Sequence, residues 1–425
     1  MLHVAREIAA GLRRTRDSVP PSTAEAAVKT MFLAISTKAP PPRAHLMTAL
    51  GEEGRAAAGR YLRTISNYAP TPLVSLPAQA SERGVAAIHV KDEGQRLGLK
   101  SFKALGGAYA VATLVLDKAA RRLGKPLGAA DLADPEVRAV AAAMTVACAT
   151  DGNHGRSVAW GAKKAGCRAV IFIHGGVSQG RADAMAAFGA EIRRIAGSYD
   201  DSVRLAAETA AEEGWTVVSD TSWDGYEDIP LTVMQGYTAM AGEALDALAA
   251  PPTHVFLQAG VGGLAAAVAS YMQQRLGAAA PKVVVVEPAR AACLFESAKA
   301  RRPVTIPHGE PTVMAMLECA TPSPIAFEVL AAIADGYVTL DENEATDAMK
   351  LLAGPLPGDP AIVAGESGGT GFAGFLACMA DPAARAHLGL GPQSRILVIN
   401  SEGATDPQIY AGIVGRTPEQ VQENP

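Results

Sequence analysis

The sequence has few cysteines and few aromatic residues, and its charges nearly balance. Five cysteines among 425 residues form no CxxC pair, which argues against a zinc site and against a disulfide-stabilised secreted scaffold. Eight histidines form no HExxH pattern, so we predict no catalytic metal. A formal net charge of −5 gives no electrostatic reason to expect binding to nucleic acid or to an anionic membrane.

Long apolar runs are also missing. Glycine, proline or charged residues interrupt every hydrophobic stretch before it reaches the roughly 20 residues of a membrane-spanning helix. The N-terminus carries several arginines but lacks the apolar core of a signal peptide, so we expect a cytoplasmic protein. What the chain does have is 49% apolar residues and 42 glycines, a composition ordinary for an α/β enzyme of two domains.

From about residue 85 onward, short β-branched runs alternate with alanine-rich helical stretches. This alternation is typical of mostly parallel sheets with helices on both faces. The expected strands are 86–91, 143–149, 168–173, 215–219, 253–258, 282–287 and 395–400. The expected helices include 155–165, 178–188, 200–213, 230–249 and 261–276. We expect residues 118–140 to be a surface insertion and the tail after about 408 to be frayed.

Lys103 is the most informative single residue, because it follows Ser-Phe and begins an apolar helical run. Burial disfavours the ammonium form of a lysine and lowers its pKa, and the neutral amine can condense with an aldehyde. Pyridoxal phosphate is such an aldehyde, and a lysine Schiff base is its usual attachment. On this segment alone, a surface lysine on an amphipathic helix would be the plainer interpretation.

Two further segments place a polar or glycine-rich loop after an apolar strand. Residues 145–155 end in Thr-Asp-Gly-Asn-His-Gly, and residues 253–264 end in Gln-Ala-Gly-Val-Gly-Gly-Leu. Free amides and the dipole at the start of the next helix form an anion site, and glycine lets a phosphate approach the backbone. A glycine loop alone would also suit an NAD-binding module. Together with Lys103 and the Asn-His loop, it favours a pyridoxal phosphate site.

These segments resemble the fold-type II pyridoxal phosphate enzymes, the group of tryptophan synthase β and threonine dehydratase. They are more similar still to the diaminopropionate ammonia-lyase family, over about residues 65–410. The similarity is carried by residues 102–110, 150–155, 220–226, 234–237, 258–262 and 400–406. Two positions depart from the family: Lys100 replaces a small polar residue, and Ser401 stands where threonine is frequent.

The resemblance implies an α/β protein of tryptophan synthase β-like fold. Two open, mostly parallel sheets would have helices on both faces, and the cofactor would lie in the cleft between two domains. The large domain would comprise residues 1–105 and 225–425, and the small domain residues 106–224. The resemblance also implies a homodimer.

The resemblance assigns site residues by position. Lys103 would form the Schiff base with pyridoxal 5′-phosphate, next to Phe102. Asn153 would hydrogen-bond the 3′ oxygen of the cofactor, and the Ser401 hydroxyl would face its pyridine nitrogen, which favours β-elimination over transamination. The cofactor phosphate would be bound by backbone amides of the glycine loop, Gly260, Val261, Gly262, Gly263 and Leu264. The substrate would be bound by Ser101, Thr150, Asp151, Gly152, His154 and Asp220.

Asp151 carries the physical case for the substrate. Serine and threonine dehydratases resemble this loop but have a small neutral residue at that place. A carboxylate beside the loop that should bind the substrate carboxylate calls for a second ammonium group on the substrate. Asp220 would add another negative group. The plainer alternatives are that Asp151 caps the helix starting near Asn153, and that Asp220 is a turn residue at a strand end.

We therefore predict a pyridoxal phosphate-dependent carbon–nitrogen lyase that cleaves D- or L-2,3-diaminopropionate to pyruvate and ammonia. Lys103 and Asp151 would be the bases for opposite enantiomers, and Asp220 would also be catalytic. The alternatives are a serine or threonine dehydratase, a lyase for another β-substituted amino acid, an NAD-binding module and a non-catalytic cofactor carrier. Cys293 and Cys319 both follow segments expected near the cofactor and could form a disulfide, although the cytoplasm favours reduced thiols.

Overall fold

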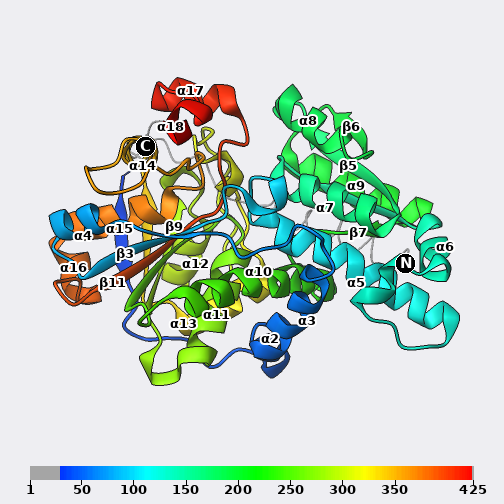
Figure 1. Cartoon of the computed structure of the whole chain (residues 1–425), viewed down its shortest axis with the longest axis horizontal. Coiled ribbons are helices and arrows are strands. Elements are labelled where there is room, and N and C mark those ends of the chain that lie inside the picture. Colours follow the sequence, from blue (N-terminus) through cyan, green and yellow to red (C-terminus); the bar gives the residue numbers. More distant parts are fainter. Residues whose placement is uncertain (1–28, 424–425) are drawn as a thin grey trace. The chain divides into compact units, whose positions relative to one another are not determined.

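The computed structural model describes residues 29–423, which form two compact units (Figure 1). Unit 1 contains residues 60–66 and 103–233, and unit 2 contains residues 29–59, 67–102 and 234–423. The sequence predicted a large domain of residues 1–105 and 225–425 and a small domain of residues 106–224. These domain limits stay a proposal.

Unit 1 is built on a four-stranded parallel sheet with the order β6-β5-β4-β7. Parallel neighbours need a crossover, and a helix supplies each one here. The strands are β4 (Thr145–Ala149), β5 (Arg168–His174), β6 (Glu191–Ile195) and β7 (Thr216–Val217). The crossover helices are α7 (Asn153–Ala165), α8 (Gln179–Ala186) and α9 (Tyr199–Glu213). The sequence predicted three of these strands but missed β6, in which three of the five residues are charged.

Most of the predicted surface insertion at residues 118–140 is exposed, and its being an insertion stays a prediction. Helix α5 (Lys103–Leu123) runs through the first part of this segment, and α6 (Pro135–Ala142) packs against it. Val137, Val140 and Ala141 are buried because their spacing places them on one side of α6. Asp134 caps this helix by accepting a hydrogen bond from the amide of Glu136 at 2.8 Å.

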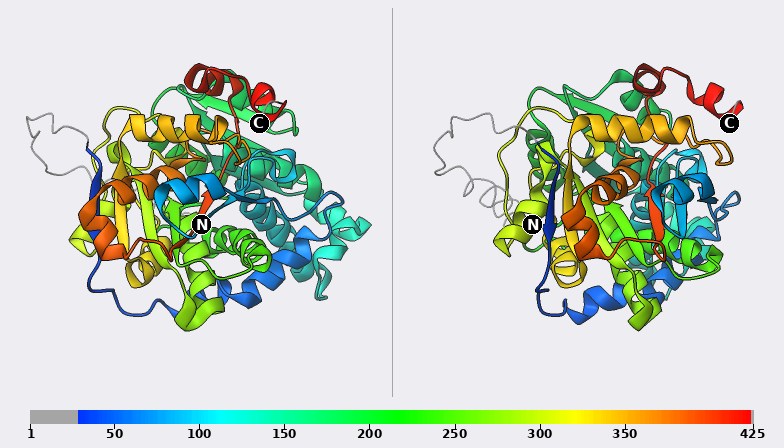
Figure 2. Two further views of the ribbon diagram at one scale, coloured as in Figure 1. Left: turned by 60° about the vertical axis from the view of Figure 1, so that its left-hand side comes forward. Right: turned by 90° about the vertical axis from the view of Figure 1, so that its left-hand side faces the viewer.

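Unit 2 is built on a seven-stranded sheet with the order β1-β10-β9-β8-β11-β3-β2. The five inner strands are parallel, and the two edge strands are antiparallel to their neighbours. The strands are β1 (Met31–Ala34), β2 (Leu73–Ser75), β3 (Ala87–Asp92), β8 (His254–Gln258), β9 (Lys282–Pro288), β10 (Gly336–Leu340) and β11 (Arg395–Asn400). Every residue of β8 and β10 is buried, as expected for a sheet with helices on both faces (Figure 2).

The core of unit 2 lies between the sheet and helices α14 and α15. Phe256 on β8 contacts Phe375 of α15 edge to face at 5.6 Å between ring centroids. The helices of this unit are α2 (Ala44–Ala49), α3 (Glu52–Leu62, whose last residues belong to unit 1), α4 (Pro77–Arg83), α10 (Asp228–Ala247, whose first residues belong to unit 1), α11 (Gly263–Leu276), α12 (Cys293–Ala300), α13 (Pro324–Ile333), α14 (Glu342–Ala353), α15 (Thr370–Ala380) and α16 (Pro382–Leu388). No helix among the described residues is both long enough and apolar enough to cross a bilayer.

The prediction of a frayed tail after residue 408 is wrong. Two helices, α17 (Pro407–Val414) and α18 (Pro418–Glu423), follow β11 and pack beside α14 (Figure 1). Asp406 caps α17 through the amides of Gln408 and Ile409, and Tyr410 is fully buried. The cap and the proline after it are ordinary start signals of a helix.

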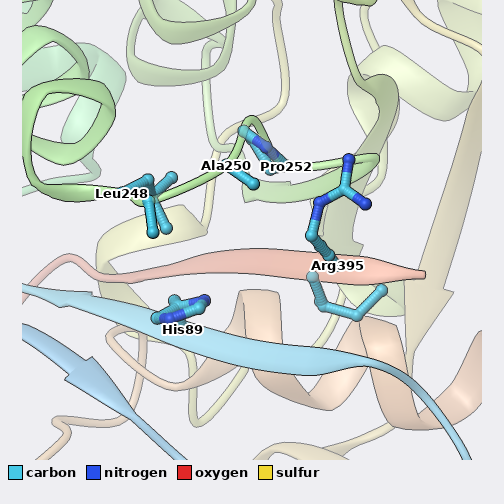
Figure 3. Close-up of a pocket in the computed structure, with 7 residues that line it drawn as sticks. His89, Leu248, Ala250, Pro252 and Arg395 are labelled. Atoms are coloured by element: carbon cyan, nitrogen blue, oxygen red, sulfur yellow. The ribbon is translucent and has the colours of Figure 1, made fainter. Parts of the chain in front are cut away.

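In both sheets the predicted site segments follow the carboxyl ends of strands, where open α/β sheets usually bind ligands. Residues 150–152 follow β4, residues 259–262 follow β8, and Ser401 follows β11. A small pocket of about 160 Å³ lies near the opposite, amino-terminal ends of β8 and β11 and is lined by His89 and Arg395 (Figure 3). None of the predicted site residues lines it.

Candidate active site

Lys103 is the first residue of α5, and its Nζ pairs with the carboxylate of Asp220. Both side chains are mostly buried, with 19% and 16% of their surface exposed. Ser157 of α7 fixes the first turn of α5, because its hydroxyl donates to the Lys103 carbonyl at 2.6 Å and accepts from the Ala108 amide at 3.0 Å. Lys103 thus lies at a helix start, but it is mostly rather than fully buried, and its role stays a prediction.

Asp220 follows β7 on a short loop that Tyr226 braces. The Tyr226 hydroxyl donates to the Val217 carbonyl at 2.8 Å and accepts from the Ser219 amide at 3.1 Å. Burial alone would raise the pKa of Asp220, but the Lys103 ammonium outweighs burial and lowers the pKa below its usual range. Asp220 is therefore the ionised partner of Lys103. It is more than a turn residue, the plainer interpretation of the sequence.

His154, on the first turn of α7, lies beside the same carboxylate. Its Nε2 contacts the Val218 carbonyl at 2.8 Å, so Nε2 carries the proton, and its Nδ1 lies 3.9 Å from Asp220 Oδ2. Burial lowers the pKa of His154 and outweighs the raising effect of the Asp220 charge, so the ring is neutral near pH 7. Within the described residues, the buried Nδ1 has no hydrogen-bond partner. This arrangement suits a residue that orders the loop.

Asp151 does not cap α7. The helix begins after Gly152 with no side-chain cap, and the Asp151 carboxylate instead meets His174, with Oδ1 2.8 Å from Nε2. Both side chains are about one quarter exposed, and both belong to unit 1. The capping alternative for Asp151 is therefore wrong in this structure, whereas its catalytic role stays a prediction.

The Thr150 hydroxyl closes the turn before α7. Its Oγ1 accepts hydrogen bonds from the Gly152 amide at 3.0 Å and from the Gly155 amide at 3.1 Å. A Cβ on Gly155 would lie 2.3 Å from Thr150 Cγ2, so only glycine fits there. Asn153, the first residue of α7, is buried next to this turn. Thr150 therefore stabilises the turn before α7, a structural role that the sequence did not indicate.

In unit 2, the predicted phosphate loop, Gly260–Leu264, joins β8 to α11. Gly262 has φ +100°, and a Cβ there would lie 3.1 Å from Leu294 Cδ1 and 3.2 Å from Ala326 Cβ, so a side chain is disfavoured by both conformation and space. The first amides of an α-helix have no partner within the helix. Those at the start of α11 can bind an anion such as a phosphate without any lysine or arginine in the loop.

Glu287 and Cys293 connect the start of α12 to the glycine loop, and the sequence did not indicate these contacts. The two oxygens of Glu287 accept the amides of Leu294 and Phe295 at 2.8 and 2.6 Å, which fixes the start of α12. Cys293 of that helix donates through Sγ to the Gly260 carbonyl at 3.6 Å. Burial raises the pKa of Glu287 to about 8. No disulfide joins Cys293 to Cys319 in this structure.

Ser401 is buried directly after β11 and is tied to the residues that precede Lys103. The Phe102 amide donates to the Ser401 carbonyl at 3.0 Å, and Ser101 forms an antiparallel bridge with Glu402. The Phe102 ring packs at 4.7 Å from that of Tyr237. Lys100, which departs from the family pattern, has φ +56°, a conformation unusual for a residue with a side chain.

A buried ionic cluster anchors the segment from residue 91 to residue 102. Arg96 pairs with Glu93 at 2.7 Å and with Glu243 at 2.6 Å, and Lys91 pairs with Glu243 at 2.6 Å. All four side chains are almost fully buried. The two positive charges balance the two negative charges, which buried ions require. The missed signal was the pair of cationic residues inside and just after a strand.

The residues of the two units suit pyridoxal phosphate by the chemistry of their donors. Unit 1 has a mostly buried amine, and unit 2 has a crowded glycine turn before α11, whose first amides have no partner within the helix. Among the described residues, no group of three histidine, cysteine, aspartate or glutamate side chains could hold a metal ion. Comparison with known proteins then gives the family.

The family model for pyridoxal-phosphate dependent enzymes matches residues 65–402. Over 364 residues, the chain is 38% identical to the diaminopropionate ammonia-lyase of Escherichia coli (strain K12), and the match covers 84% of this chain and 90% of that relative. This chain belongs to the diaminopropionate ammonia-lyase family.

Solved structures of the family share its fold. The Escherichia coli enzyme in complex with an aminoacrylate-PLP azomethine reaction intermediate matches with a TM-score of 0.81 at 35% identity, over 91% of this chain and 97% of that one. The same enzyme in complex with D-serine matches with a TM-score of 0.81 at 34% identity and the same coverage. The predicted fold class, the resemblance and pyridoxal phosphate as cofactor are confirmed.

Proposed function

We propose that this chain is a diaminopropionate ammonia-lyase, which converts 2,3-diaminopropionate and water to pyruvate and two ammonia. The observation that carries the proposal is the charge pattern of unit 1, where Asp151 and Asp220 lie on the unit that holds Lys103. Neither aspartate caps a helix. A substrate with a second ammonium group matches this excess of carboxylates, whereas the neutral hydroxyl of serine or threonine does not.

Specific residues would bind the cofactor. Bound to a substrate amine, pyridoxal phosphate withdraws electrons from the α-carbon and makes its proton acidic. Lys103 would hold the cofactor through Nζ, Asn153 would hydrogen-bond its 3′ oxygen, and Ser401 would face its pyridine nitrogen. Phe102 would lie beside it. The phosphate would be bound by the amides of the loop Gly260, Val261, Gly262, Gly263 and Leu264, which the positive φ of Gly262 supports.

Two bases would serve the two enantiomers of the substrate. Once released from the cofactor, the neutral Lys103 Nζ would take the α-proton on its own face. The Asp151 carboxylate would take the α-proton that points the other way. Asp220 keeps its charge because of Lys103 and would accept a hydrogen bond from whichever ammonium is present, that of Lys103 or the β-ammonium of the substrate. The substrate would also contact Ser101, Thr150, Gly152 and His154.

Substrate ranking tests the reaction. The rate of pyruvate release should be higher with D- and L-diaminopropionate than with serine, threonine or another β-substituted amino acid at equal concentration. A chain that releases pyruvate faster from serine, or 2-oxobutanoate faster from threonine, would be a dehydratase, which is the alternative function. No specific observation in the structure favours that alternative.

Stereochemistry tests the roles of the two bases. General-base catalysis contributes roughly 10²–10⁴-fold to a rate. Asp151→Asn should therefore lose most turnover of D-diaminopropionate and retain much of the turnover of the L enantiomer, with the absorption band of the bound cofactor unchanged. An equal loss with both enantiomers would make Asp151 a binding group for the β-ammonium instead.

We also propose a homodimer in the cytoplasm, with no nucleic-acid or membrane partner. The family resemblance supports the dimer, and the near-neutral charge and interrupted apolar runs of the sequence support the other two statements. A monomer mass in light scattering would contradict the dimer.

A further inference from the structure

His174 is the last residue of β5, and the backbone fixes its proton. Its Nδ1 accepts a hydrogen bond from the Gly176 amide at 3.1 Å, so in the neutral ring Nε2 carries the hydrogen and donates to Asp151 Oδ1 at 2.8 Å. A Cβ on Gly176 would lie 2.7 Å from His174 Cε1, so the glycine leaves room for this ring position. The imidazole is thus bound at both nitrogens.

The turn that carries His174 is itself fixed. Arg194 of β6 donates through Nη1 to the carbonyls of His174 at 3.4 Å, Gly175 at 3.3 Å and Val177 at 2.7 Å. A surface histidine that happened to meet a carboxylate would not need such support. Here the contacts of three backbone carbonyls and one backbone amide fix the position of the ring independently of Asp151.

We propose that His174 is a positioning residue for Asp151, and this inference rests on the proposed role of Asp151 as a base. The hydrogen bond to Oδ1 holds the carboxylate in one rotamer and leaves Oδ2 to accept the α-proton of the substrate. The arrangement is that of a base oriented by a second group, in which a small displacement is costly because proton transfer requires close approach. His174 acts only on the enantiomer that Asp151 serves.

Three single variants and one double variant test the inference. In the holoenzyme, His174→Ala should lower kcat for D-diaminopropionate by roughly tenfold to a hundredfold, with little change in KM and little change for the L enantiomer. His174→Gln should restore most of the lost rate, because its amide nitrogen can donate from the position of Nε2. His387→Ala is the matched control, since His387 is also half-buried with Nε2 3.0 Å from a backbone carbonyl, that of Asp335.

The double variant separates this inference from the function on which it rests. If His174 acts through Asp151, adding His174→Ala to Asp151→Asn should not lower the D rate any further. Additive losses, equal losses for both enantiomers in His174→Ala alone, or a Gln variant as slow as the Ala variant would each overturn the role of His174. If Asp151→Asn itself affects both enantiomers equally, the two-base scheme fails, and the double variant still shows whether His174 acts through Asp151.

Discussion

The ammonium of Lys103 and the carboxylate of Asp220 form an ion pair that joins the start of α5 to the loop after β7. The two residues are 117 positions apart in the sequence, and each is mostly buried. In the cofactor-free protein, the Lys103 ammonium holds the pKa of the Asp220 carboxyl below its usual range. The pair also keeps a carboxylate ready beside the amine that is to react.

Asp220→Asn should therefore destabilise the cofactor-free protein, and the loss should depend on pH. The folded-state pKa of Asp220 is lowered, so its stabilising contribution is complete above the unfolded-state pKa of about 3.9 and is lost as the pH falls through the folded-state pKa. Removing one partner of a buried pair costs about 3–5 kcal/mol. Urea unfolding at pH 7 should show a loss near the lower end of that range, because both side chains are partly exposed, and the gap should narrow below about pH 4.

Asp224→Asn is the control for this measurement, because Asp224 is exposed on the same loop. Its stability should match that of the wild type at both pH values. A gap between Asp220→Asn and the wild type that is the same at pH 7 and at about pH 2 would show that the ion pair is not its cause.

Borohydride reduction of the holoenzyme should place the pyridoxyl label on Lys103. The nearest competitors along the chain are Lys91 and Lys100. Lys91 is fully buried, and its Nζ donates to Glu243 at 2.6 Å and to the Thr71 carbonyl at 2.7 Å. Its amine is therefore not available to the cofactor. Peptide mapping that finds the label on Lys91 or Lys100 would refute the assignment. Lys103→Ala should lose the label and the activity together.

Gly262→Asp should sharply lower the affinity for the cofactor. The new side chain would be strained at φ +100°, would meet Leu294 and Ala326, and would bring a negative charge towards the phosphate. Gly277→Ala is a suitable control, because Gly277 also has a positive φ, +54°, at the other end of α11, with nothing within 4 Å of the added Cβ. Cofactor titration should separate the two variants, and equal affinities would contradict phosphate binding at Gly262.

The stability of the wild type should fall with rising pH because of Glu287. Its folded-state pKa is raised to about 8 by burial, so the folded chain binds a proton that the unfolded chain has released at pH values between about 4.5 and 8. Each pH unit in that window costs up to about 1.4 kcal/mol. Glu287→Gln removes this dependence at the cost of one acceptor for the amides of α12, so it should be most destabilising relative to the wild type near pH 5 and least so above pH 8.

Glu296→Gln serves as the control for that experiment, since Glu296 is half-buried on α12, the helix whose amides Glu287 binds. Because burial is the main cause of the raised pKa of Glu287, this variant should keep the fall in stability with rising pH. If the difference between Glu287→Gln and the wild type did not change from pH 5 to pH 8.5, the carboxyl of Glu287 would not be protonated in the folded protein.

The parts of the fold that could be predicted are those with a local signal. Strands β8, β9 and β11 are unbroken apolar runs, and the glycine loop and Asn-His loop follow their strands directly. Strand β1 was missed because it has only four residues and pairs with β10, some 300 positions away. Helix α17 carried the usual start signals, an aspartate cap and a proline, and was missed because they lie close to the end of the chain.

The candidate site divides in the same way. Lys103, Asp151 and Gly262 were found from the sequence because each stands in a short pattern. The partners that fix them lie elsewhere in the chain: His174 is 23 positions from Asp151, and Asp220 is 117 positions from Lys103. Such pairs form only when strands and helices pack together, so no local sequence pattern predicts them.

The ratio of ammonia to pyruvate released by the purified holoenzyme from 2,3-diaminopropionate tests the central claim most directly. Loss of the β-amine followed by hydrolysis of the remaining imine gives two ammonia per pyruvate, whereas dehydration of serine gives one. The account predicts a ratio of two for the D and L enantiomers alike, with no pyruvate from Lys103→Ala. No pyruvate from either enantiomer by the wild type, or a ratio of one, would contradict it.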